Sequence, residues 1–189
     1  MHTNPTNQFL MKWVAITTLG WIGAQALGIF ITRAAFPEAE LAALPSSPLY
    51  FGVFGVLLGL SQWICIHDRI PNSNWWVFAT GFGCFVAALL LKSLNRSETI
   101  NSFLREVPLL AYLFGGAIIG FTQRMAMQKT VQKAKLWTIA VAISWGIAQV
   151  FITVDNIVVN LLGVLVFATI TGVVFVWLMQ NPFSEIQPA

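Results

Sequence analysis

The chain has 189 residues, of which 57% are hydrophobic and 9% are charged, with a net charge of +3 and a mean hydropathy of +0.76. Soluble domains carry about 25% charged residues, so the composition excludes a water-exposed globular domain. The basic residues fall in loops and form no nucleic-acid-binding surface. We therefore predict an all-α integral membrane protein with a single membrane domain over residues 1–189.

Six apolar segments are each long enough to cross a bilayer, which takes about 20 residues. In chain order they cover residues 12–33, 49–66, 75–93, 107–127, 136–154 and 158–180, between short polar tails at 1–11 and 183–189. Because a span must satisfy its own backbone hydrogen bonds, all six are predicted to be helices. The first segment is too long for a signal-peptide core and is expected to be retained.

The two longest polar breaks, 36–48 and 94–108, contain stretches of helical spacing at 37–44 and 97–108. These stretches are either ordinary connections or short interfacial helices that cover an outward cavity.

The distribution of basic residues predicts the orientation. With six spans both termini lie on one side, and this side receives more Lys and Arg than the other, whereas the acidic residues favour the opposite side. The positive-inside rule then places both termini in the cytoplasm. Four tryptophans are expected at the cytoplasmic interface: Trp13, Trp75, Trp76 and Trp137.

The chain also repeats itself. Trp13, Trp76 and Trp137 begin the odd-numbered segments at intervals of 63 and 61 residues. The even-numbered segments carry matching glycines, and glutamine follows in the first two of them. We predict three tandem two-helix hairpins, at 12–72, 73–134 and 135–182, around a pseudo-threefold axis along the membrane normal.

Small residues at helical spacing form stripes on several segments. Such stripes let two helix backbones approach closely in lipid. The predicted helix-packing residues are Gly20, Ala24, Gly28, Gly52, Gly55, Gly59, Gly116, Gly120, Ala168 and Gly172.

Four glutamines inside the spans are the candidate ligand-binding residues: Gln25, Gln62, Gln123 and Gln149. Gln62 and Gln123 lie about one turn from the cytoplasmic end, and the other two lie deeper. Two interpretations are open for them. They form hydrogen bonds between helices, or they converge on a bound molecule.

Catalytic and metal-binding patterns are missing from the sequence. His67-Asp68-Arg69 follows a span and reads as a solvated turn, and no carboxylate lies deep in a span. No nucleotide or metal motif is present. Cys65 and Cys84 are expected to be buried without a disulfide. We therefore predict a protein that is not an enzyme and binds no metal.

The stretch 59–83, GLSQWICIHDRIPNSNWWVFATGFG, resembles a repeat in uncharacterised bacterial multi-span membrane proteins, with the pattern GLxQWxxLR, a polar turn, then WWVxAxxxG. His67 and Arg124 depart from that pattern, and the second copy, 120–144, fits more loosely. The resemblance implies this fold and a bacterial inner or internal membrane, and no activity. Substrate-binding subunits of energy-coupling vitamin transporters are similar in size and helix number. Mitochondrial carriers share three hairpins, but their signature motif is absent.

Two hypotheses follow for function. The first is a non-catalytic subunit or docking element of a larger membrane assembly, or a bundle that binds lipid or pigment. The alternative is a small-solute transporter, or the substrate-binding membrane subunit of one, with Gln25 and Gln149 lining its cavity. The expected partners are membrane lipids and a further membrane protein or a second copy of the chain, and no nucleic acid.

Overall fold

The computed structural model describes residues 5–38, 47–94, 107–154 and 156–181. These residues form six α-helices and no strand. The helices are α1 (Pro5–Ala35), α2 (Pro48–Ile66), α3 (Asn74–Leu94), α5 (Pro108–Met127), α6 (Lys135–Ile152) and α7 (Ile157–Met179). Each is long and apolar enough to cross a membrane, which confirms the all-helical prediction with six membrane-length segments.

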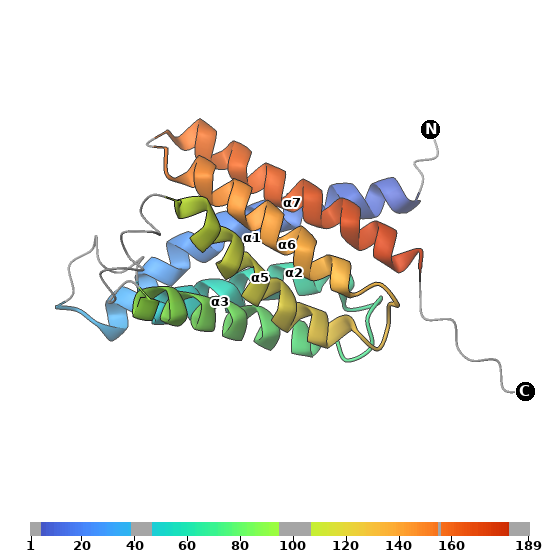
Figure 1. Cartoon of the computed structure of the whole chain (residues 1–189), viewed down its shortest axis with the longest axis horizontal. Coiled ribbons are helices and arrows are strands. Elements are labelled where there is room, and N and C mark those ends of the chain that lie inside the picture. Colours follow the sequence, from blue (N-terminus) through green and yellow to red (C-terminus); the bar gives the residue numbers. More distant parts are fainter. Residues whose placement is uncertain (1–4, 39–46, 95–106, 155, 182–189) are drawn as a thin grey trace, which may run out of the picture.

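The helices form a closed ring in chain order. Each helix packs against the next one in sequence, and α7 packs against α1. Figure 1 shows that α1 begins and α7 ends on the same side of the bundle, where the α2–α3 and α5–α6 connections also lie. The connections after α2, α5 and α6 are seven, seven and four residues long, and such short loops make the helices that they join run antiparallel.

The first helix begins earlier than the predicted segment. It starts at Pro5 instead of residue 12, so most of the predicted polar tail is helical. Proline suits a first helical turn because its missing N–H would have no helical partner there. Phe9 explains the extra turns: it is buried and stacks on Phe175 of α7, with 5.5 Å between the ring centroids.

Two helix starts are capped by side chains. Ser47 Oγ accepts a hydrogen bond from Tyr50 N (3.1 Å) at the start of α2. Asn156 Oδ1 accepts from Val158 N (2.9 Å) and Val159 N (3.2 Å) at the start of α7. These caps satisfy N–H groups that a helix start leaves without partners. They fix where the two spans begin.

Many large apolar side chains lie on the outside of the bundle. Large hydrophobic side chains such as Phe30, Phe78 and Ile157 are more than 60% exposed. A water-soluble protein rarely exposes so much apolar surface, so the surface suits a bilayer. The two stretches predicted as interfacial helices, 37–44 and 97–108, lie almost wholly outside the described residues.

Candidate functional site

An aromatic cluster fills the centre of the bundle near the end that carries the chain termini. Trp13 of α1, Trp76 of α3 and Trp137 of α6 surround Phe175 of α7, and all four side chains are completely buried. Phe175 stacks on Trp13 with 5.1 Å between the centroids and meets Trp137 edge-on at 5.9 Å. Each such pair contributes about 0.5–1.5 kcal/mol beyond burial. These rings therefore pack together in the centre of the bundle at this level.

This position corrects one expectation. Trp13, Trp76 and Trp137 lie inside the bundle and are not exposed to lipid headgroups, whereas Trp75 is 67% exposed. Their indole N–H groups have buried partners, which holds the rings inward.

A buried amide network surrounds the cluster. Trp76 Nε1 donates to Gln62 Oε1, and Trp137 Nε1 donates to Gln123 Oε1, each at a distance of 3.0 Å. Gln123 Nε2 in turn donates to Thr80 Oγ1 (3.0 Å) and to Gln62 Oε1 (3.4 Å). The network therefore ties α2, α3, α5 and α6 together. Gln62 and Gln123 thus form hydrogen bonds between helices, as the first of their two interpretations expects.

The third tryptophan is bonded differently. Trp13 Nε1 donates to Thr171 Oγ1 of α7 (3.2 Å), and the threonine hydroxyl donates to Phe167 O (2.8 Å) of its own helix. Phe175 stands where the other two hairpins have glutamine. A hydroxyl one turn earlier thus replaces the amide as acceptor.

The other two glutamines do not meet. Gln25 is exposed on the outer face of α1, whereas Gln149 is half-buried and lines a pocket between helices. Gln25 lines neither of the two pockets described below. Of these two glutamines, only Gln149 lies at a described pocket.

The predicted packing residues of α2 face α3 of the same chain. A Cβ added to Gly55 would lie 2.7 Å from Thr80 O, and one added to Gly59 would lie 3.1 Å from Val77 Cα. Such distances leave no room for a side chain, so the two backbones are in direct contact.

The remaining predicted packing residues also meet helices of this chain. Gly116 approaches Ala142, Gly120 approaches Thr138, Gly172 approaches Trp13, Gly20 approaches Ser61, Gly28 approaches Tyr50, Gly52 contacts Phe85, and Ala24 and Ala168 are buried. The ring itself thus uses these residues, which are not left on its surface.

Two pockets flank the place where α3 meets α5. Gly83 of α3 brings the helices together: an added Cβ would lie 3.0 Å from Ile119 Cα and would also touch Thr122 Oγ1. Thr122 lines one pocket and Ile119 lines the other. We call the first the α3–α5 groove and the second the inner pocket.

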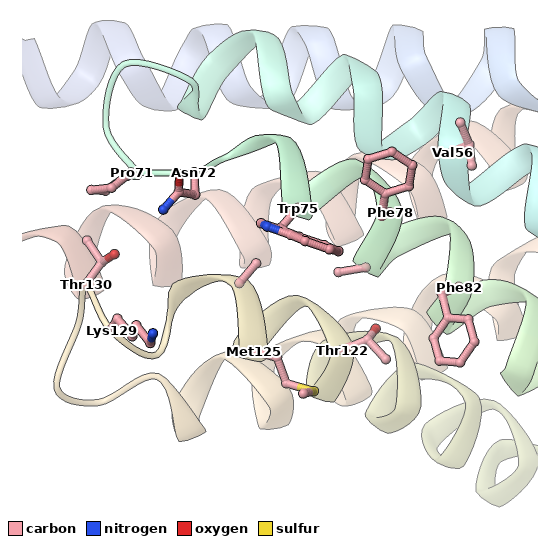
Figure 2. Close-up of a pocket in the computed structure, with 12 residues that line it drawn as sticks. Val56, Pro71, Asn72, Trp75, Phe78, Phe82, Thr122, Met125, Lys129 and Thr130 are labelled. Atoms are coloured by element: carbon pink, nitrogen blue, oxygen red, sulfur yellow. The ribbon is translucent and has the colours of Figure 1, made fainter.

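The α3–α5 groove has a volume of about 1000 Å³ and apolar walls. Figure 2 shows Trp75, Phe78 and Phe82 of α3 on one side and Met125 of α5 on the other. All four side chains are mostly exposed, on the outer face of the bundle. The lining residues are Val56, Pro71, Asn72, Trp75, Phe78, Ala79, Phe82, Thr122, Met125, Ala126, Lys129 and Thr130.

One end of the groove is polar. Lys129 and Thr130 follow α5, and Asn72 precedes α3 with a φ of 57°, a left-handed conformation that asparagine tolerates better than most residues. In Figure 2 these three residues lie together at the end away from Phe82. The groove therefore pairs a long apolar channel with a cationic, hydrogen-bonding end, and no acidic residue lines it.

The inner pocket is smaller, about 440 Å³, and lies towards the opposite end of the bundle. Its lining residues come from α2, α3, α5 and α6: Phe51, Cys84, Ala87, Ala88, Leu91, Lys92, Tyr112, Gly115, Ile119, Trp145 and Gln149. It is thus the space that Gln149 faces.

Reactive side chains do not form a cluster in the part of the chain that the structure describes. No group of three His, Cys, Asp or Glu residues there is placed to hold a metal ion. His67 Nε2 lies 3.0 Å from Asp68 Oδ1 on the surface, with the aspartate 82% exposed. Cys65 and Cys84 are free and buried.

Sequence reasoning missed several residues of these sites. Thr80, Thr171 and Phe175 belong to the central network, and Lys129 belongs to the groove. Thr80 lies four residues after Trp76, one helical turn on, which is the signal that could have identified it. Nothing local marks Lys129, because its partners come from another loop.

The described residues and these pockets define a class: an all-helical protein of six membrane-length helices with apolar pockets between them. A scan against protein-family models and searches among curated proteins and solved structures find no match to the chain.

Proposed function

We propose that the chain is a non-catalytic membrane-spanning bundle that holds an anionic phospholipid in the α3–α5 groove. The observation that carries this proposal is the pairing of apolar walls with Lys129, Asn72 and Thr130 at one end. Acyl chains pack along Phe78, Phe82 and Met125. The phosphate lies at the lysine ammonium, with the amide and the hydroxyl as further donors.

The position of the polar end supports a lipid ligand. Lys129 lies just after the last residue of α5, Met127, where a span meets the headgroup region. Other cations at this end have aromatic neighbours: Arg69 Cζ lies 4.4 Å from the Phe9 ring centroid, and Lys133 Nζ lies 5.0 Å from that of Trp177. A basic end of the bundle attracts anionic headgroups.

The filled centre does not favour the transporter alternative. Gln62 and Gln123 are at most 2% exposed and bond to each other and to tryptophans. A solute that crossed along the axis would have to separate this network and displace Phe175. Association with another membrane protein stays a proposal, as does a homo-oligomer.

The three-hairpin architecture also belongs to this proposal. It is supported by two equivalent tryptophan–glutamine pairs, Trp76 with Gln62 and Trp137 with Gln123. In each pair the residues are fourteen apart in sequence and form a hydrogen bond of 3.0 Å. We further propose that both termini face the cytoplasm, because Lys129 and the other basic loop residues share that end.

Replacing Lys129 by glutamine is expected to lower phospholipid retention at least fivefold, because the phosphate loses its charged partner. The measurement is native mass spectrometry of protein released from nanodiscs that contain phosphatidylglycerol and phosphatidylcholine. The wild-type chain is expected to keep phosphatidylglycerol in preference to phosphatidylcholine.

Lys135→Gln is the matched control, since it removes the same charge from the start of α6 without touching the groove. It is expected to keep the wild-type lipid preference. Equal retention in Lys129→Gln and wild type, or equal losses in both variants, would contradict the groove as the lipid site.

A further inference from the structure

A second aromatic layer lies deeper in the bundle than the central cluster. Trp21 of α1 packs against Phe54, Trp145 and Phe167, with centroid distances of 5.1 Å, 5.1 Å and 5.2 Å. These rings come from α1, α2, α6 and α7, so four of the six helices contribute to this layer.

The other two helices place small residues at this level. Trp21 and Trp145 follow Trp13 and Trp137 by eight residues, and the residue at the same offset from Trp76 in α3 is Cys84. Phe54 precedes Gln62 by eight residues, and the residue at that offset before Gln123 is Gly115. Cys84 and Gly115 both line the inner pocket. The pocket therefore occupies the place where two aromatic rings are missing.

A small side chain would fit at Gly115 without a clash. A Cβ built there would meet Leu91 Cδ1 at 3.6 Å, Ala87 Cβ at 3.9 Å and Trp145 Nε1 at 4.0 Å, all at ordinary contact distances. By comparison, a Cβ on Gly116, the next residue, would lie 2.9 Å from a backbone Cα. A volume of about 440 Å³ falls in the range of about 300–1000 Å³ that small-molecule sites occupy.

Hydrogen-bond donors gather on the walls of the pocket. No hydrogen bond is recorded for the indole N–H of Trp145 among the described residues, and the neighbouring buried indole N–H of Trp21 also lacks a partner, whereas those of Trp13, Trp76 and Trp137 are bonded. Gln149 lies one turn further along α6 than Trp145 and lines the same space.

The outer end of the pocket is cationic. Lys92, in the last turn of α3, and Tyr112 line the pocket, and none of the lining residues is acidic. An apolar interior with a lysine and several neutral donors favours a ligand with a single negative charge.

We propose that the inner pocket binds a small apolar molecule that carries one carboxylate. Its apolar body fills the gap between Cys84 and Gly115, and its carboxylate lies towards Lys92 and Gln149. This site is separate from the phospholipid groove, since the contact of α3 with α5 at Gly83 divides them and they have no lining residue in common.

Dodecanoate and dodecanol, which differ in the charged group, are the probes for this site. Binding is measured by native mass spectrometry of the full chain released from phosphatidylcholine nanodiscs. The wild-type chain is expected to retain one dodecanoate at least tenfold more strongly than dodecanol. Gly115→Phe, which supplies the ring that the other hairpins carry, is expected to lower dodecanoate binding at least tenfold. Gly23→Phe is the control, because Gly23 has open space around it.

A second variant keeps the proposal testable if Gly115→Phe does not fold. Lys92→Gln is expected to abolish the preference for dodecanoate over dodecanol and to leave dodecanol binding unchanged. Dodecanoate binding that survives Lys92→Gln unchanged, or that is lost in Lys129→Gln instead, overturns the proposal by placing the carboxylate elsewhere. The proposal is also overturned if dodecanoate binds equally well to the wild-type chain and to a folded Gly115→Phe variant.

Discussion

A chain that carries Gly59→Leu and Gly120→Leu is expected to lose its folded bundle. A Cβ on Gly59 would lie 2.9 Å from Thr80 Cβ and 3.1 Å from Val77 Cα, and one on Gly120 would lie 2.9 Å from Thr138 Cα. Backbone atoms cannot move aside as the end of a flexible side chain can. Overpacking a core costs about 1–3 kcal/mol at each site, and here two helix pairs, α2–α3 and α5–α6, must separate.

The measurement is the yield of monodisperse protein in mild detergent, together with its thermal unfolding. Gly23→Leu is the matched control, because no atom lies within 4 Å of a Cβ built at Gly23 in α1. The control is expected to purify and melt like the wild type. If the double variant does so too, the two glycines do not hold helices together.

The sequence predicted the helices well because lipid leaves a span few alternatives. Each span must satisfy its own backbone, so length and apolar composition were enough to locate six helices. The start of the first helix was missed because the polar residues Thr6, Asn7 and Gln8, and then Lys12, interrupt the apolar pattern. Phe9 anchors this first part of the helix to the bundle, and its partner Phe175 is more than 160 residues away in the sequence.

The candidate sites were less predictable, since each depends on residues from several helices. Gln25 and Gln149 both follow a tryptophan by twelve residues, yet Gln25 is exposed and Gln149 lines the inner pocket. The difference arises from Cys84 and Gly115, small residues on two other helices that leave the space in front of Gln149 empty. Only the comparison between repeats, in which Cys84 aligns with Trp21 and Trp145, gives a signal for such a pocket.

The buried amides were identified from sequence, but their partners were not. An amide inside a span needs hydrogen bonds, which marked Gln62 and Gln123 as candidates. The register that joins them to Trp76 and Trp137 depends on how the helices pack around the ring, and no local pattern encodes it.

Gln123→Leu is expected to lower the unfolding free energy by about 2–4 kcal/mol, because it leaves the Trp137 indole N–H without an acceptor and takes the Gln123 donor from Thr80. In a chain of this size each kcal/mol lowers Tm by about 2–4 °C. The measurement is thermal unfolding in nanodiscs. Gln25→Leu, the same change at an exposed position, is expected to leave Tm unchanged, and equal melting of the two variants would show that the network adds no stability.

A double-mutant cycle then separates the energy of the Trp137–Gln123 hydrogen bond from the effect of changing the shape of the Gln123 side chain. Trp137→Phe removes the donor that Gln123→Leu leaves without a partner, so the combined variant is expected to be destabilised by less than the sum of the two single changes. Replacing both members of a buried polar pair costs less than stranding one of them. The Trp137 indole N–H is buried away from water, so it has no alternative acceptor. We therefore expect the coupling energy between Trp137 and Gln123 to exceed the average of about 0.6 kcal/mol for membrane helix bundles. If the losses in unfolding free energy are purely additive, Gln123 stabilises the helix bundle by packing alone.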